Sequence, residues 1–262
     1  MSNSIAFDQA AEYYDQTRAV PPEVEKQGVD AIAAALGLEA GARVLEAGVG
    51  TGRWAIPLSR RGYCYHGLDI SMPMLRKLVS KQPPVDAPVM LTQGDVTSLP
   101  YRDGSFAGVL VVHVFHLVPQ YRQAIAEVRR VLQRGGVALA VGDGVVRDDD
   151  FQMMVSRKLG EFMAEYGYKH EDVFESWNDV LTTMREGASQ LDDYTAFTWE
   201  TLTTARAEYD YIAARRWSWL WQIPDAAFQP ALAELRNWLE AEYDMDAPIN
   251  RVRDFKITKV VY

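Results

Sequence analysis

Apolar and polar residues follow two alternating patterns along the first half of the chain. Short apolar runs are typical of strands that are buried on both faces of a parallel sheet. These runs cover residues 43–47, 63–69, 89–93, 106–112 and 137–141. The segments between them place apolar residues every three or four positions, as amphipathic helices do. Strands that alternate with helices predict an α/β fold with a parallel sheet.

The second half of the chain follows a different pattern. Residues 145–190 are rich in charged residues with apolar ones at helical spacing, and 194–199 and 255–262 read as two further strands. Trp217 and Trp221 lie on either side of Trp219 at a spacing of two, which predicts an extended segment. Such aromatic density could line a pocket or pack the last helix against the sheet.

A glycine-rich turn follows the first predicted strand. Glu46-Ala47-Gly48-Val49-Gly50-Thr51-Gly52 leads into a predicted helix, whose first N–H groups can face a ligand. A dinucleotide-binding turn would have its third glycine where Arg53 stands. Glu46 would repel a phosphate there but would attract a cation. The turn therefore favours a cationic nucleoside over a dinucleotide.

Two acidic residues mark the ends of the next two strands, Asp69 as the last residue of one and Asp95 just after the other. Asp69 lies about twenty residues beyond the glycine turn, where a βαβ unit places a carboxylate near ribose hydroxyls. Ile70 offers an apolar side chain for an adenine ring. Asp95 could accept a hydrogen bond from an adenine amino group, while the Val96 N–H meets a ring nitrogen. Each aspartate could instead be an ordinary helix cap.

Four motifs carry a family resemblance. VLEAGVGTG, GLD ending at Asp69, QGDV around Asp95 and RRVLQRGG occur in this order between Phe7 and Val141. With them the chain resembles the class I S-adenosylmethionine-dependent methyltransferases, of the ubiquinone/menaquinone-biosynthesis branch. The resemblance implies a three-layer, doubly wound, Rossmann-like α/β fold. Its seven-stranded mixed sheet would have the last strand antiparallel beside the sixth.

The same resemblance implies a division of the chain. Residues 1–144 would form the S-adenosylmethionine-binding core with an N-terminal helical segment. Residues 145–190 would form a helical lid inserted after the fifth strand, or else a packed hairpin without ligand contact. Residues 191–262 would complete the core.

The resemblance also assigns site residues, with S-adenosyl-L-methionine as cofactor and S-adenosyl-L-homocysteine as product. The predicted cofactor-binding residues are Tyr14, Arg18, Glu46, Gly48, Gly50, Asp69, Ile70, Asp95, Val96 and His113. Tyr14 and Arg18 could equally belong to an amphipathic surface helix.

His116 is the predicted catalytic residue, because a neutral imidazole can accept a proton from an incoming nucleophile. It could instead be a structural histidine. Asp143 is a second candidate base or a turn residue. His113 and His116 lack a third ligand at a suitable spacing, so no metal is expected.

The composition of the chain limits the kinds of partner and the cellular compartment to be expected. The 262 residues carry a net charge of −9, which argues against nucleic acid as a partner. The single cysteine rules out an intrachain disulfide and is typical of a cytoplasmic protein, and no signal peptide or membrane-spanning run is evident. We expect a small-molecule methyl acceptor; the sequence indicates neither its identity nor an oligomeric state. The alternatives are an NAD(P)-dependent oxidoreductase and a non-catalytic cofactor-binding module.

Overall fold

The computed structural model describes residues 7–8, 11–17, 20–82, 88–169 and 177–262. These residues form two compact units. Unit 1 comprises Met1–Asp143, Val173–Ala196 and Phe255–Tyr262, and unit 2 comprises Gly144–Asp172 and Phe197–Asp254.

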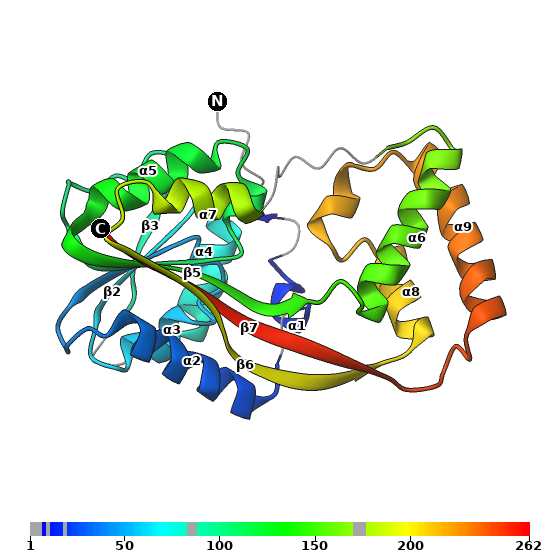
Figure 1. Ribbon diagram of the computed structural model, residues 1–262, viewed down its shortest axis with the longest axis horizontal. Coiled ribbons are helices and arrows are strands. Elements are labelled where there is room, and N and C mark those ends of the chain that lie inside the picture. Colours follow the sequence, from blue (N-terminus) through cyan, green and yellow to red (C-terminus); the bar gives the residue numbers. More distant parts are fainter. Residues whose placement is uncertain (1–6, 9–10, 18–19, 83–87, 170–176) are drawn as a thin grey trace. The chain divides into compact units, whose positions relative to one another are not determined.

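Helices and strands alternate through most of the chain (Figure 1). The strands are β1 (Arg43–Ala47), β2 (Cys64–Asp69), β3 (Met90–Gln93), β4 (Phe106–Val112), β5 (Leu132–Val146), β6 (Gln190–Thr203) and β7 (Ile249–Val261). The α-helices are α1 (Tyr14–Thr17), α2 (Pro22–Leu36), α3 (Ala55–Ser59), α4 (Met72–Lys81), α5 (Tyr121–Val131), α6 (Phe151–Glu165), α7 (Trp177–Arg185), α8 (Ala205–Ala213) and α9 (Asp225–Glu242). Two short 3₁₀ helices are η2 (Phe115–Leu117) and η3 (Ser218–Gln222).

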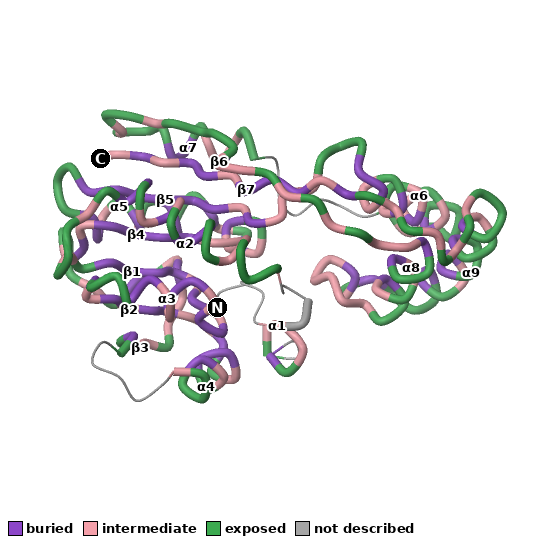
Figure 2. The backbone as a smooth tube through the Cα atoms, turned by 90° about the horizontal axis from the view of Figure 1, so that it is seen from below, coloured by how far each residue is buried: buried purple, intermediate pink, exposed green. Residues whose placement is uncertain are grey.

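One seven-stranded sheet has the order β3-β2-β1-β4-β5-β7-β6. Its first five strands are parallel, and Leu45 of β1 pairs with His66 of β2 on one side and with Val109 of β4 on the other. Both β1 and β4 are largely buried, as Figure 2 shows, because helices cover the two faces of the sheet. The predicted doubly wound α/β fold is confirmed.

The last strand runs against the others. The Ser189 N–H, just before β6, donates to the Val261 carbonyl at 2.8 Å, and Thr258 donates to Asp193 at 2.5 Å. Residue numbers thus rise along β6 as they fall along β7, so the two strands are antiparallel. The prediction that the last strand lies antiparallel beside the sixth is confirmed, and β7 separates β6 from β5.

The helices of 145–190 divide between the two units. Helix α6 packs in unit 2 against α9, where Val155 and Leu159 join a buried apolar cluster. Helix α7 packs in unit 1, where Val180 and Met184 join the cluster that includes Val128 of α5. The function of 145–190 as a lid remains a prediction.

The segment around Trp219 was predicted to be extended, and this prediction is wrong. The segment forms the 3₁₀ helix η3 of unit 2. The helical turn buries Leu220 completely, whereas Trp217 and Trp219 pack at the edge of the same apolar cluster. The Trp217 and Trp219 rings stack with centroids 6.1 Å apart, and the Trp221 ring N–H donates to the Arg215 carbonyl at 2.8 Å. These contacts favour a packing role for the tryptophans.

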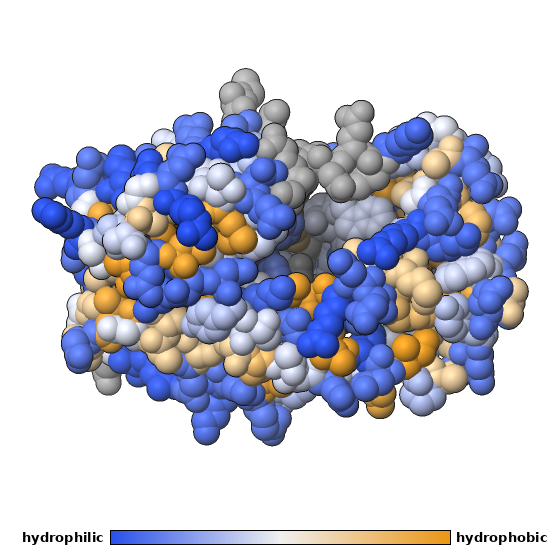
Figure 3. All heavy atoms as spheres, viewed as in Figure 1, coloured by the Kyte–Doolittle hydropathy of each residue, from blue (hydrophilic) through white to orange (hydrophobic). Residues whose placement is uncertain are grey.

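Hydrophilic residues dominate the surface shown in Figure 3, and apolar ones appear there in separate small areas. Among the described residues no helix is both long and apolar enough to span a bilayer.

Candidate active site

A cavity in unit 1 opens where the parallel strands end. It is lined by the glycine turn after β1, by the residues after β2 and β3, by the end of β4 and by the N-terminal segment. The lining residues are Phe7, Tyr14, Gly48, Gly50, Asp69, Ile70, Met74, Gly94, Asp95, Val96, Val112, His113, Val114, Leu117 and Val118. This is the edge of an open α/β sheet at which ligands bind.

The glycine turn brings bare backbone to the cavity. Gly50 and Gly52 have φ angles of 53° and 81°, a region that glycine adopts without strain. A Cβ on Gly52 would lie 2.5 Å from the Leu78 side chain, so this glycine is required by packing. A Cβ on Gly50 would meet no protein atom within 4 Å, although Gly50 lines the cavity. Gly50 therefore leaves room for a bulky ligand against the turn.

Backbone N–H groups of the glycine turn and of Ser71 hold the Asp69 side chain in place. One carboxylate oxygen accepts the Gly50 N–H and the other accepts the Ser71 N–H, each at 2.8 Å. Each oxygen has a second lone pair, which can accept from a ligand hydroxyl. Burial raises the pKa of Asp69, and the two backbone hydrogen bonds oppose that rise. Ile70 lines the cavity next to it.

Asp95 follows β3 and lines the same cavity. The Thr97 N–H and hydroxyl both donate to one of its carboxylate oxygens at 2.8 Å, which fixes the side chain. Val96 also lines the cavity. The arrangement fits the predicted reading of an adenine edge by Asp95 and Val96, which remains a prediction.

Glu46, in β1, is not among the lining residues and is only 2% exposed. The Tyr65 hydroxyl donates to it at 2.8 Å. Burial raises the pKa of Glu46 to about 8, and the nearby carboxylates of Asp69 and Asp143 add to the effect. Glu46 is therefore mostly protonated at pH 7. Its predicted attraction for a cationic cofactor requires that cofactor binding drive off this proton.

The two predicted histidines differ in position. His113 lines the cavity, has a φ of 52° and is held by Asp143 of β5. His116 lies on η2, is exposed and is not among the lining residues; its ring centroid is 6.1 Å from that of His113. The structure thus places His113 closer to the predicted chemistry than His116.

The N-terminal segment is attached to the glycine turn. The Thr51 hydroxyl donates to Asp15 at 2.6 Å, and the Lys81 amine donates to the same carboxylate at 3.0 Å. The Phe7 and Tyr14 rings, 5.9 Å apart and edge to face, both line the cavity. Predicted Tyr14 thus reaches the site, whereas predicted Arg18 lies outside the described residues.

Several lining residues have no individual signal in the sequence. Leu117 and Val118 follow β4 in an apolar run that gives no hint of ligand contact, and Met74 belongs to the buried face of α4. No three His, Cys, Asp or Glu side chains of the described part of the chain are grouped as metal ligands.

Comparison with known proteins agrees with this geometry. Residues 45–140 match the family model described as a methyltransferase domain. A demethylmenaquinone methyltransferase of Renibacterium salmoninarum is 32% identical over 131 residues, which are 50% of this chain and 54% of that protein. Residues 45–140 thus correspond to a methyltransferase domain. It spans about half the length of the curated relatives it matches.

Solved structures extend the likeness in fold beyond the methyltransferase domain. The phosphoethanolamine N-methyltransferase 2 of Haemonchus contortus, bound to S-adenosylhomocysteine, has a TM-score of 0.58 at 18% identity and covers 97% of this chain and 57% of that one. The [4+2]-cyclase SpnF has a TM-score of 0.60 at 16% identity, and the match covers 100% of this chain and 98% of that one. S-adenosyl-L-methionine is the cofactor of the methyltransferase family, as predicted.

The open side of Gly50 supplies a direct test of this site. We expect Gly50→Ala to lower the affinity for S-adenosylmethionine at least tenfold, which is about 1.4 kcal/mol, because the methyl group enters the ligand's space. Gly37→Ala is the matched control, since Gly37 has a similar φ of 61° and lies at the end of α2. Both variants should lose about 1 kcal/mol of folding stability. Calorimetric titration showing equal affinity in the two variants would contradict the placement.

Proposed function

We propose that the protein transfers a methyl group from S-adenosyl-L-methionine to a small-molecule acceptor. The observation that carries the proposal is the cavity at the carboxyl ends of the parallel strands, with the open face of Gly50 beside the fixed carboxylate of Asp69. These groups fit a nucleoside without phosphates, because carboxylates accept from hydroxyl and amino groups and repel phosphate.

The bound cofactor supplies a methyl group already activated by its sulfonium. The chain's own residues then have to hold cofactor and acceptor in line and keep water out. Such orientation can contribute about 7–11 kcal/mol to lowering the barrier. Apolar side chains of Val114, Leu117 and Val118 line the cavity near His113 and suit the exclusion of water.

The acceptor is open to a direct assay. Purified protein is incubated with S-adenosylmethionine and, one at a time, catechol, 1,4-dihydroxynaphthalene and phosphoethanolamine, which represent hydroxyl, hydroquinone and amine acceptors. Release of S-adenosylhomocysteine with any of them supports the proposal. Micromolar binding of NADH without binding of S-adenosylmethionine would replace it with an oxidoreductase. Cofactor binding without turnover on a wide metabolite panel would favour a non-catalytic module or other chemistry on this fold.

Asp69 gives a second test of the cofactor site. We expect Asp69→Ala to weaken S-adenosylmethionine binding by about 1–3 kcal/mol, roughly 5- to 150-fold, because a buried charged acceptor is lost. Asp148→Ala is the control, since the Asp148 side chain is 96% exposed. Titration of both variants, with circular dichroism to verify folding, measures the effect. Unchanged affinity in a folded Asp69→Ala would show that the ribose lies elsewhere.

A further inference from the structure

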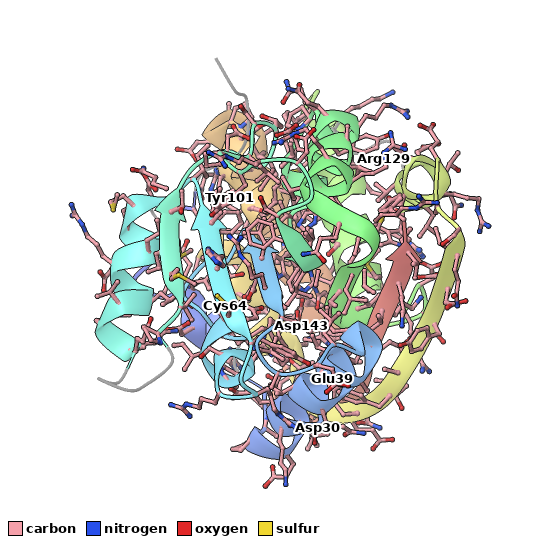
Figure 4. The ribbon with its side chains drawn as sticks, turned by 90° about the vertical axis from the view of Figure 1, so that its left-hand side faces the viewer. Asp30, Glu39, Cys64, Tyr101, Arg129 and Asp143 are labelled. Carbon is pink, nitrogen blue, oxygen red and sulfur yellow. The ribbon has the colours of Figure 1, made fainter. Side chains whose placement is uncertain are left out.

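His113 is held in an unusual backbone conformation at the cavity. It is one of only two non-glycine residues with positive φ in the described chain. The conformation costs about 1 kcal/mol or more and persists only where neighbouring contacts enforce it. Here the enforcing contacts come from Asp143, thirty positions later in the sequence and labelled in Figure 4.

The contacts of His113 define its tautomer. Its Nε2 lies 3.1 Å from the Asp143 backbone carbonyl and also contacts a carboxylate oxygen of the same residue. A carbonyl and a carboxylate can only accept, so Nε2 must carry the proton. In a neutral imidazole the lone pair then belongs to Nδ1. No hydrogen bond to this nitrogen occurs within the described part of the chain.

A third residue, Arg53, forms an ion pair with Asp143. The Asp143 side chain is 2% exposed, and its other carboxylate oxygen lies 2.6 Å from an Arg53 guanidinium nitrogen. Arg53 stacks over the Trp54 ring at 4.8 Å, and Trp54 packs edge to face on Phe255 at 5.6 Å. Arg53 therefore fixes the position of the carboxylate that contacts His113.

We propose that His113 is the general base of the methyl transfer, with Asp143 and Arg53 as positioning residues. The inference rests on the proposed function and defines its acceptor class: a nucleophile that must lose a proton, such as a hydroxyl. The O–H bond breaks and its proton passes to Nδ1 of His113. The freed electron pair forms the O–CH₃ bond while the C–S bond breaks, and that pair remains on sulfur. The resulting imidazolium is stabilised by the carboxylate of Asp143.

The tautomer is measured by long-range ¹H–¹⁵N correlation spectra of protein labelled at its four histidines. His113→Gln and His116→Gln assign the two signals. The expected wild-type spectrum has Nε2 protonated and Nδ1 unprotonated at His113, and the signal shifts when S-adenosylhomocysteine is added. In Asp143→Asn the backbone carbonyl still accepts from Nε2–H but the charged acceptor is lost, so the Nε2 signal should shift, whereas Asp148→Asn should leave it unchanged. A protonated Nδ1 in the neutral wild type, or no response to Asp143→Asn, overturns the proposal.

Turnover with catechol separates this proposal from the proposed function. His113→Gln and Asp143→Asn should each lower turnover 10²- to 10⁴-fold, a far larger factor than any loss of affinity for S-adenosylmethionine. Loss of cofactor affinity equal to the loss of turnover would make His113 a binding residue and overturn its role as base. If the wild type binds no S-adenosylmethionine, the proposed function fails, and the spectra still decide the state of His113.

Discussion

Glu46→Gln should make the cofactor-free protein more stable than the wild type above pH 8. Burial raises the pKa of Glu46 from 4.5 to about 8, so the folded protein holds this proton more tightly than the unfolded chain. Between pH 4.5 and 8 the free energy of unfolding therefore falls as the pH rises, and it levels off above 8. The whole loss is at most about 5 kcal/mol, and glutamine, which has no proton to lose, avoids it.

Urea unfolding from pH 5 to 9 measures this difference. The two proteins should be similar near pH 5, where Glu46 is protonated in the folded wild type and the amide of the substituted side chain can accept the same hydrogen bond from Tyr65. Other groups, including Glu208 with a pKa raised to about 7, contribute to the pH dependence of both proteins and cancel in the comparison. Parallel curves across the whole range would show that Glu46 is ionised in the folded protein.

Arg251→Met should destabilise unit 2 by about 3–5 kcal/mol, the cost of breaking a buried ion pair by removing one partner. Arg251 is 9% exposed and lies 3.0 Å from Glu208 and 3.2 Å from Asp150, which caps α6. Arg253 also pairs with Asp150 at 2.8 Å, so the loss falls mainly on Glu208. Without Arg251, the pKa of Glu208 rises further and the residue stays protonated.

Tryptophan fluorescence during urea unfolding reports on this unit. Most of the tryptophans belong to unit 2, namely Trp199, Trp217, Trp219, Trp221 and Trp238. Arg206→Met is the control, because the Arg206–Asp246 pair is mostly exposed and should matter little. Equal effects of the two substitutions would mean that the buried network contributes no more than a surface pair.

Much of the fold could be predicted because its signals are local. The apolar strands, the glycine turn and Gly37 at the end of α2 each reflect residues within a few positions of one another. The conformation of the tryptophan segment could not be predicted, because burial of Leu220 by the rest of unit 2 outweighs the spacing of the tryptophans. Local pattern failed where distant packing decided the conformation.

The candidate site shows the same division. The sequence indicated Asp69 and Asp95 because Asp69 ends one strand and Asp95 comes just after the next, and the structure places both at the cavity. The contact between His113, just after β4, and Asp143 of β5 joins residues thirty positions apart and has no local signal. The raised pKa of Glu46 also could not be predicted from the sequence, since it results from burial of the side chain in the folded core.

The position of β7 between β5 and β6 has a consequence during synthesis. In the described sheet β6 has β7 as its neighbour, so it cannot join until residues 249–261 have left the ribosome. Until then the edges of β5 and β6 both offer unpaired backbone groups to other chains. Nascent protein stalled before β7 should therefore be more prone to aggregate, and to bind chaperones, than the finished chain.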